Sequence, residues 1–213
     1  MSQATAPTLR FYSNPMSRAR TVRWMLEECG AEYETVELEY GQAMKTPQYL
    51  AINPMGKVPA LQHGDAVITE TGAILAYLAE LFPAKHLAPP QGSPERAAYL
   101  RWLFFVAGPV DAAIHARIEG WLENQTDRQA TAAGFGRFDD VVRTLQQAVA
   151  GKRYVCGEHF TAADLYLASY IGWGMMQGSL PALAEFKAYA QPLLQRAASV
   201  RADALDGPMA VAA

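Results

Sequence analysis

The chain has 213 residues, of which 51% are hydrophobic and 18% are charged, a composition typical of a packed protein of one or two domains and not of a disordered chain. Its 18 Lys and Arg residues and 21 Asp and Glu residues give a formal charge of −3, which argues against a general nucleic-acid binder because such a protein needs a basic face. The most apolar run, 97–110, is interrupted by Arg101 and Pro109, so we expect no segment to span a membrane.

The first 38 residues predict a strand, a helix and a second strand, in that order. Residues 8–12 have the composition of a short strand, and residues 33–38 alternate in polarity as a half-buried strand does. Between them, residues 17–29 place apolar side chains at helical spacing, and Gly30 then stops the helix. The apolar stripe of this helix consists of Val22, Met25, Leu26 and Cys29.

The next part of the chain predicts a loop, a hairpin and a helix. Residues 39–56 contain two glycines and two prolines, which indicates a loop with one short helix around 46–51. The runs VPALQ at 58–62 and AVITE at 66–70 flank His63-Gly64-Asp65, a pattern that predicts a β-hairpin. A helix is predicted over 70–82, with Ile74, Tyr77, Leu78 and Leu81 on one face.

This order of elements predicts a small mixed sheet with helices packed on it. The segment 84–93 is rich in proline and glycine and predicts a linker. Beyond it no strand pattern occurs. The sequence therefore predicts an α+β protein with a first domain over 1–83, a linker over 84–93 and an all-helical domain over 94–213.

The helical part begins with a clear start signal. Ser93 is suited to be an N-cap and Pro94 to be the first helical residue. We expect a helix from there to about Ala107, kinked at 108–109 and continuing to Trp121. Later elements are a helix over 127–150, one that begins at Thr161, and further helices punctuated by Pro181 and Pro192.

Pro59 stands at the entry to the first hairpin strand, where a ladder would need a backbone donor. Proline is tolerated at the first residue of a strand or on an edge strand, and this is the simpler interpretation. The alternative is a cis Val58–Pro59 bond, which would turn the backbone N–H and C=O of Val58 outward. Those groups would then hold an extended peptide as an added strand.

Glu70 and Thr71 stand at the start of the helix that follows the hairpin. Ordinary capping chemistry explains a carboxylate and a hydroxyl at such a position. The functional interpretation uses the same physics, because a helix N-terminus attracts an anion and Glu70 beside it would answer an ammonium. A group that carries both charges is an amino-acid head, so the two sites together predict a small peptide ligand.

Ser17 is placed to begin the first helix, directly after the first strand. The plain interpretation is an N-cap. The functional interpretation is a hydroxyl at a helix N-terminus that stabilises a thiolate, whose pKa such a site lowers from about 8.5 towards neutrality. The chain has no cysteine there and no C-x-x-C, so the thiol would belong to the ligand.

These segments resemble the cytosolic glutathione S-transferases, in a bacterial, serine-class-like form, over essentially the whole chain. The resemblance rests on AINPMGKVPAL at 51–61, ETGAILAYL at 70–78, VRWMLEE at 22–28 and GEHFTAADLYLASY at 157–170. It implies that the first domain is thioredoxin-like and binds glutathione, and that the helical domain is the family's bundle. In the last segment Thr161 and Asp164 are spaced as an N-cap box, which we assign to folding and not to chemistry.

The resemblance also implies which residues bind glutathione. Glu70 and Thr71 would bind the γ-glutamyl end, and Val58 would pair with the cysteinyl backbone beside a cis Pro59. A lysine would lie near the glycyl carboxylate, although a solvated side chain explains such a lysine equally well. The candidates are Lys57 and Lys45.

The family activates the glutathione thiol with a Tyr, Ser or Cys side chain, and this sequence offers more than one hydroxyl. Pro15-Met16-Ser17 is similar to the Pro-x-Ser of the serine-type members, whereas Tyr12 has the spacing of the tyrosine-type members. Ser13 is a third hydroxyl nearby. A cysteine-type enzyme is disfavoured because neither cysteine lies near the first strand. We predict that Ser17, ahead of Tyr12, activates the thiol.

The electrophile site should be apolar and should lie between the two domains, as ligand sites often do. Five large side chains are candidates, and for each of them a place in the core is the simpler interpretation. They are Trp102, Phe105, Trp173, Met175 and Met176. The four histidines are scattered and the two cysteines make no ligand set, so no metal site is expected.

The resemblance implies a homodimeric detoxification enzyme that conjugates glutathione, its co-substrate, to a small apolar electrophile. No metal, nucleic acid or membrane is expected to take part. The alternatives are a glutathione-dependent peroxidase or reductase, and a non-catalytic glutathione-binding or ligand-binding protein on the same scaffold. The first residues lack a secretory signal and the two cysteines make no disulfide framework, so we expect a cytoplasmic protein.

Overall fold

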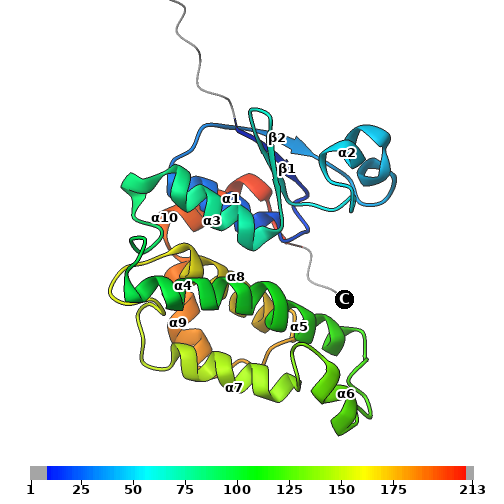
Figure 1. The fold of residues 1–213 in the computed structure, drawn as a ribbon, viewed down its shortest axis with the longest axis vertical. Helices are drawn as coiled ribbons and strands as arrows, with labels where there is room; N and C mark the ends of the chain where they lie inside the picture. The colour runs from blue at the N-terminus through cyan, green and yellow to red at the C-terminus, as the bar shows by residue number, and fades with distance from the viewer. Residues whose placement is uncertain (1–8, 210–213) are drawn as a thin grey trace, which may run out of the picture. The chain divides into compact units, whose positions relative to one another are not determined.

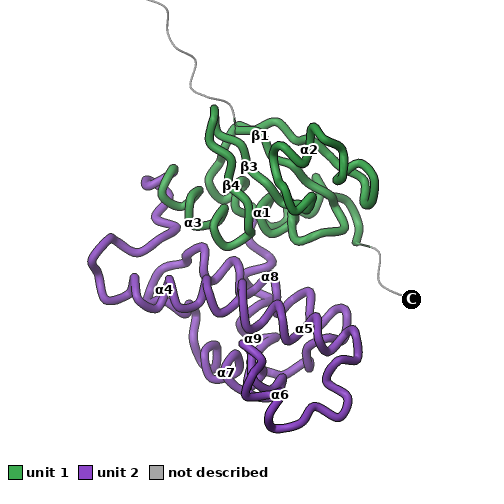
Figure 2. Tube along the Cα trace, turned by 45° about the vertical axis from the view of Figure 1, so that its right-hand side comes forward, with its two compact units in different colours: residues 1–81, 198–210 green, residues 82–197, 211–213 purple. Residues whose placement is uncertain are grey.

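The computed structural model describes residues 9–209, and their contacts divide the chain into two compact units (Figure 2). The first unit comprises the residues up to Leu81 together with the segment that begins at Ala198. The second unit begins at Phe82 and ends at Ala197. The predicted linker and domain ranges remain predictions, but the grouping differs from them at the C-terminal end, where the last helix joins the first unit.

The first unit is built on a four-stranded mixed sheet in the order β2-β1-β3-β4 (Figure 1). β1 (Leu9–Ser13) runs parallel to β2 (Tyr33–Glu37) and antiparallel to β3 (Ala60–His63). β3 forms the predicted hairpin with β4 (Ala66–Thr69). Gly64 in the turn has φ 59°, a left-handed value that glycine adopts without steric cost.

The strands follow the predicted ranges closely, with two differences at their starts. Residue 8, predicted as the start of the first strand, lies outside the described residues. The strand predicted from residue 58 begins at Ala60, because Val58 and Pro59 form a cis peptide bond ahead of the ladder. The cis alternative for Pro59 is therefore confirmed.

One face of the sheet is covered by α1 (Ala19–Cys29) and α3 (Thr71–Leu81), which pack against each other. The apolar stripe predicted for α1 is buried, and Phe11 of β1 points to the same face, with the Arg23 guanidinium 5.1 Å from the centre of its ring. α1 ends at Gly30, whose φ of 60° closes the helix in the left-handed region. The main apolar core of the unit lies between this helix pair and the sheet.

The opposite face carries a smaller apolar cluster. Tyr12 follows Phe11 and therefore points to the other side of the pleated sheet. It packs there with Met44, Tyr49 and Ala60, below α2 (Pro47–Ile52) and the short 3₁₀ turn Gln42–Lys45. The centres of the Tyr12 and Tyr49 rings are 5.5 Å apart. Tyr12 is thus part of the packing that supports α2.

The last helix, α10 (Ala197–Asp206), lies on α1. Two ion pairs join the middle and first turn of α1 to the far end of α10, between Arg23 and Asp206 and between Arg20 and Asp203. These contacts explain why the segment from Ala198 groups with the first unit although helices of the second unit precede it in the chain.

The second unit is entirely helical within its described residues (Figure 1). The core helix α8 (Ala162–Met176) packs against α4 and α9. The other elements are a 3₁₀ turn at Pro83–Lys85, α4 (Pro94–Phe105), a π-helical turn at Val106–Val110, α5 (Asp111–Ile118), α6 (Asp127–Ala132), α7 (Phe138–Val149) and α9 (Ala184–Leu194). The prediction of an α+β protein with a thioredoxin-like part and a helical part is confirmed.

Two of the predicted helix boundaries are wrong. The helix expected over 127–150 is two helices, because the segment between α6 and α7 contains Gly136 with φ 71° and cannot continue a helix. Pro192 does not punctuate the later helices as predicted, because α9 continues through it to Leu194. A proline so near a helix end breaks little, since few residues follow it in the helix.

One helical segment, Pro94–Ile118, is long and apolar enough to cross a membrane by length and composition, with 39% of its most apolar window buried. The sequence suggested an interruption at Pro109, but the chain accommodates this residue in a π-helical turn and stays helical. A core helix of a soluble protein can have the same length and composition, so these two properties are weak evidence for a membrane segment.

Asp164 is a fully buried carboxylate of the helical unit, and donors bind both of its oxygens. One carboxylate oxygen accepts from the Val155 N–H at 2.7 Å and from the Tyr189 hydroxyl at 2.8 Å. The other accepts from both the N–H and the hydroxyl of Thr161 at 2.8 Å. Burial raises the pKa of Asp164, and these four donors oppose that shift. The residue joins the start of α8 to α9 and to the preceding loop, in agreement with a folding role.

We expect Asp164→Ala to lower the free energy of unfolding by about 3 kcal/mol or more, because it leaves several buried donors without an acceptor. The matched control is Gln129→Ala in the exposed capping box that Gln129 forms with Thr126, which should cost about 1 kcal/mol or less. Urea denaturation of both variants measures the difference. Equal losses in the two variants would contradict the assignment of Asp164 as a structural centre.

Candidate functional site

Three loops leave the sheet of the first unit at the same end. β1 ends at this point, β3 begins there and β4 ends there, because Ala60 pairs with Tyr12 on one side and with Thr69 on the other. The residues that the sequence predicted for the site follow or precede these strand ends by a few positions. Strand pairing therefore gathers Ser17, the Val58–Pro59 peptide and the Glu70-Thr71 pair at one end of the sheet.

The loop between β1 and α1 is a tight turn organised by Asn14, a buried side chain. Its carboxamide donates to the Leu38 carbonyl at 2.8 Å and accepts from the Met16 N–H at 2.9 Å. Its backbone carbonyl accepts from the Ser17 N–H at 3.0 Å. Asn14 is not among the site residues predicted from the sequence, although Asn-Pro is a recognised turn signal.

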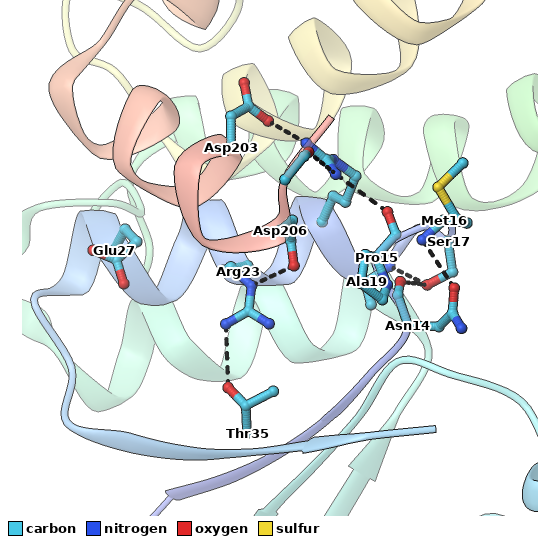
Figure 3. A network of polar contacts seen from close by, with 12 residues as sticks. Asn14, Pro15, Met16, Ser17, Ala19, Arg23, Glu27, Thr35, Asp203 and Asp206 are labelled. Atoms are coloured by element: carbon cyan, nitrogen blue, oxygen red, sulfur yellow. Dashed lines mark hydrogen bonds and ion pairs between the residues drawn. The ribbon is translucent and has the colours of Figure 1, made fainter. Parts of the chain in front are cut away.

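Ser17 lies in the last part of this turn, two residues before α1, and is 7% exposed. Its hydroxyl donates to the Asn14 carbonyl at 2.7 Å and accepts from the Ala19 N–H at 3.0 Å. The contact with Ala19 satisfies the first N–H group of the helix. The N-cap position itself is occupied by Arg18, whose side chain makes no capping hydrogen bond, so Ser17 lies one residue before the N-cap position predicted for it. Figure 3 shows the side chains of Asn14, Ser17 and Ala19 together at the start of α1.

The other two hydroxyls considered for the same role have different surroundings. The Tyr12 ring is 7% exposed in the cluster below α2, and its hydroxyl donates to the Gln62 carboxamide oxygen at 3.1 Å. Ser13 is fully buried at the end of β1. The backbone carbonyl of Ser13 accepts from the Leu38 N–H at 2.8 Å. Ser17 is the one of the three at the N-terminus of a helix.

α2 and the loop after it fix the peptide that precedes the cis Val58–Pro59 bond. Two donors converge on the Lys57 carbonyl, the Tyr49 hydroxyl at 2.6 Å and the Asn53 carboxamide at 2.7 Å. Burial raises the pKa of Tyr49 to about 12, so this hydroxyl keeps its proton and stays a donor. The peptide before Val58 is thereby fixed, and Val58 itself precedes the ladder, which begins at Ala60.

Glu70 has φ 67°, a left-handed value that is uncommon for a residue with a side chain. Its carbonyl accepts from the Ile74 N–H at 3.0 Å, so Glu70 occupies the N-cap position of α3. The side chain of Glu70 is exposed and that of Thr71 is half-buried. A non-glycine residue in this region costs free energy, of order 1–3 kcal/mol, and such residues cluster at functional sites.

The two lysines have different local roles. Lys45 donates through its ammonium to the Met55 carbonyl at 2.7 Å and so closes the loop around α2. Gly56 lies beside it, and a Cβ at that position would clash with the Met44 carbonyl oxygen. The Lys57 side chain is exposed. That either lysine binds a carboxylate stays a prediction.

The five apolar candidates for the electrophile site all lie in the helical unit, on α4 and α8. Trp102 is 6% exposed and meets Phe105 edge to face, with ring centres 5.7 Å apart. Met176 at the end of α8 is 40% exposed. Within residues 9–209, no group of three or more His, Cys, Asp and Glu side chains is arranged to hold a metal ion.

Comparison with known proteins identifies both parts of the chain. The family model of the glutathione S-transferase N-terminal domain matches residues 7–80, and that of the C-terminal domain matches residues 128–173. Among characterised relatives, glutathione S-transferase 1 of Dianthus caryophyllus is 32% identical over 199 residues, which cover 86% of this chain and 87% of that protein. GstA of Escherichia coli O157:H7 is 27% identical over 175 residues, covering 80% and 85%.

Solved structures give the same result. A glutathione transferase from Methylococcus capsulatus str. Bath superposes with a TM-score of 0.76 at 26% identity, covering 94% of this chain and 99% of that one. A sphingomonad glutathione S-transferase, solved in complex with glutathione, has a TM-score of 0.74 at 29% identity and covers 93% and 98%. The chain therefore belongs to the glutathione S-transferase family of enzymes.

Proposed function

We propose that the chain binds glutathione at the gathered end of the sheet, activates its thiol with Ser17 and transfers the sulfur to a small apolar electrophile. The observation that carries the proposal is the position of the Ser17 hydroxyl, at the N-terminus of α1 and at the same sheet end as the Val58–Pro59 and Glu70-Thr71 segments. A related sphingomonad enzyme was solved with glutathione, which supports this choice of ligand.

The contacts of Ser17 support a role as donor to a thiolate. The Ala19 N–H donates to its oxygen and so makes the hydroxyl a stronger donor. Its proton is directed to the Asn14 carbonyl, which also accepts from the Ser17 N–H. Rotation of the hydroxyl towards a bound sulfur would therefore leave this carbonyl with a partner. The helix N-terminus adds a positive field at the same point.

The chemistry that follows needs little from the protein beyond this stabilisation. The glutathione thiol releases its proton to solvent, and the resulting thiolate donates an electron pair to the electrophilic carbon. A C–S bond forms, and either a leaving group departs with its bonding pair or the electrons move into an acceptor group of the electrophile. Donation from Ser17 lowers the energy of the anionic sulfur at neutral pH.

The other predicted site residues would hold the backbone and the charged ends of glutathione. Val58 precedes the ladder and would pair with the backbone of the cysteinyl residue as an added strand. The Glu70 carboxylate would answer the ligand's ammonium, and Thr71 with the start of α3 would hold the adjoining carboxylate. The left-handed backbone of Glu70 supports a ligand role, because a helix can begin without this conformation and the free-energy cost that it carries. Lys45 or Lys57 would face the glycyl carboxylate.

The broader setting follows from family membership. We propose a homodimer, the arrangement typical of these enzymes, a cytoplasmic location and a role in detoxification. The electrophile would be apolar and small, and candidate side chains for its site remain those on α4 and α8.

The chain's own thiols are unsuited to the chemistry. Cys29 is 1% exposed within α1, and Cys156 is 6% exposed beside Asp164. Burial, reinforced by the Asp164 charge, raises the pKa of Cys156 to about 12, so this thiol stays protonated. Ligand sulfur as the nucleophile, and not a protein cysteine, is consistent with these surroundings.

Neither cysteine should react with a thiol reagent in the folded protein. We expect an absorbance assay with an aromatic disulfide at pH 8 to detect no fast-reacting thiol, and to detect both cysteines after unfolding in guanidinium. One thiol that reacts rapidly in the native protein, and whose loss by substitution with alanine abolishes turnover, would show that the mechanism uses a protein cysteine.

Ser17→Ala should raise the pKa of the bound glutathione thiol and lower conjugation turnover by about tenfold to a thousandfold, the scale of losing one donor to a developing anion. Glutathione affinity should change much less, because most contacts are to the peptide. The measurement is the thiolate absorbance of bound glutathione against pH.

The comparison variant is Tyr12→Phe, which should leave that titration and turnover nearly intact, since the Tyr12 hydroxyl is engaged with Gln62. A shift in Tyr12→Phe without one in Ser17→Ala would assign activation to the tyrosine. If neither variant shifts the titration, side-chain activation is wrong and a non-catalytic binding function is favoured.

Glu70→Ala should weaken glutathione binding by about ten- to a hundredfold, the equivalent of about 1.5–3 kcal/mol for charge-assisted hydrogen bonds. The control is Glu80→Ala, an exposed carboxylate at the other end of α3, which should leave affinity unchanged. Titration calorimetry measures both. Wild-type affinity in a folded Glu70 variant would remove Glu70 from the binding site.

A further inference from the structure

Each carbonyl of the turn before α1 is anchored by a different donor. The Asn14 carbonyl accepts from Ser17, and the Met16 carbonyl accepts from the Tyr40 hydroxyl at 3.1 Å. The Pro15 carbonyl accepts from the Arg20 guanidinium at 3.2 Å. The first two anchors come from nearby parts of the sheet unit. The third anchor, Arg20 of α1, also connects the turn to α10, because its guanidinium is bound to the end of that helix.

Arg20 lies in the first turn of α1, three residues after Ser17, and its side chain is only 9% exposed. The nitrogen that donates to Pro15 also donates to the Gly207 carbonyl at 3.0 Å. The other terminal nitrogen donates to an Asp203 carboxylate oxygen at 3.0 Å. One guanidinium therefore holds a carbonyl of the Ser17 turn and two acceptors at the end of α10. Figure 3 labels Pro15 and Asp203 in this network of polar contacts.

The other contacts between α1 and α10 have a different character. Arg23 binds the Asp206 carboxylate at 2.6 Å and the Thr35 hydroxyl at 3.1 Å, so it connects α10 to β2. Arg201 of α10 binds the Glu27 carboxylate and carbonyl, both at 3.1 Å, near the other end of α1. These two contacts fasten α10 to the unit. Among the three, only the one made by Arg20 includes an atom of the turn that carries Ser17.

We infer that Arg20 is a positioning residue for thiol activation, which clamps the Pro15 carbonyl to the end of α10 and thereby holds the Ser17 hydroxyl in place for the bound sulfur. The inference rests on the proposed role of Ser17. A buried guanidinium keeps its acceptors strongly, because an unpaired charge there is costly. The turn is short, so a displaced Pro15 carbonyl moves Ser17, and small displacements of a reacting group lower rates steeply.

The test compares Arg20→Met with Arg201→Met in the full-length protein. Methionine keeps most of the apolar stem and removes every donor, and Arg201→Met removes a contact between the same two helices away from the turn. We expect Arg20→Met to lower kcat about tenfold and to move the titration of the bound thiol to higher pH, with KM for glutathione changed less than about threefold. Arg201→Met should leave all three quantities unchanged.

Two further measurements separate positioning from general stability. Hydrogen–deuterium exchange of the peptide that spans 14–19, without glutathione, should be faster in Arg20→Met and unchanged in Arg201→Met. Arg20→Lys keeps the positive charge but replaces the planar guanidinium with a single ammonium group. Its kcat and its titration of the bound thiol should therefore lie between those of the wild type and Arg20→Met. If Arg20→Met does not fold, Arg20→Lys carries the test.

The outcomes distinguish this inference from the proposed role of Ser17. Wild-type exchange and wild-type titration in Arg20→Met, or in Arg20→Lys where only that variant folds, would overturn the clamp and leave Arg20 a structural residue. Faster exchange in Arg20→Met, with a Ser17→Ala variant whose titration is normal, would keep the clamp on the turn and overturn its role in activation. A shifted titration in both Ser17→Ala and Arg20→Met supports the inference.

Discussion

The pairing of β1 with a neighbour on each side is the constraint on which the site depends. β2 is parallel to β1 and β3 is antiparallel, so the C-terminal end of β1 meets the end of one partner and the start of the other. Because β4 returns antiparallel to β3, its C-terminal end reaches the same place. A shift of register by one residue would move the turn that carries Ser17 away from the cis Val58–Pro59 peptide and would exchange the two faces of β1.

The two faces of β1 pack against different parts of the sheet unit. Phe11 points into the main core under α1 and α3, whereas Tyr12 points into the smaller cluster under α2. That smaller cluster supports Tyr49, which holds the Lys57 carbonyl and so the peptide before Val58. Packing on one face thus stabilises the peptide before Val58, and packing on the other stabilises the helix that begins after Ser17. Tyr12, whose position in the sequence resembles that of an activating tyrosine, contributes to the packing under α2 in the structure.

The sequence predicted most of the sheet unit because its signals are local. Apolar periodicity located α1, the His63-Gly64-Asp65 turn located the hairpin, and the Glu70-Thr71 pair located the start of α3. Three features escaped these signals. A π-helical turn absorbs Pro109 and keeps the segment helical, positive φ at Gly136 divides one predicted helix into two, and Glu70 adopts a left-handed backbone. Each depends on how packed neighbours offset a local cost, which the order of residues alone does not show.

The contacts of Arg20 show the same limit at the site itself. Arg20 is separated from Asp203 and Gly207 by more than 180 positions in the chain. No short motif joins them, and the helices from α4 to α9, which lie between them in the chain, group with the other unit. A domain division drawn along the sequence assigns α10 to the helical part, whereas its ion pairs with Arg20 and Arg23, the second of them buried, tie it to α1. One anchor of the turn that carries Ser17, the Arg20 guanidinium of α1, is itself bound to α10, so changes in that helix would reach the proposed thiol site through this side chain.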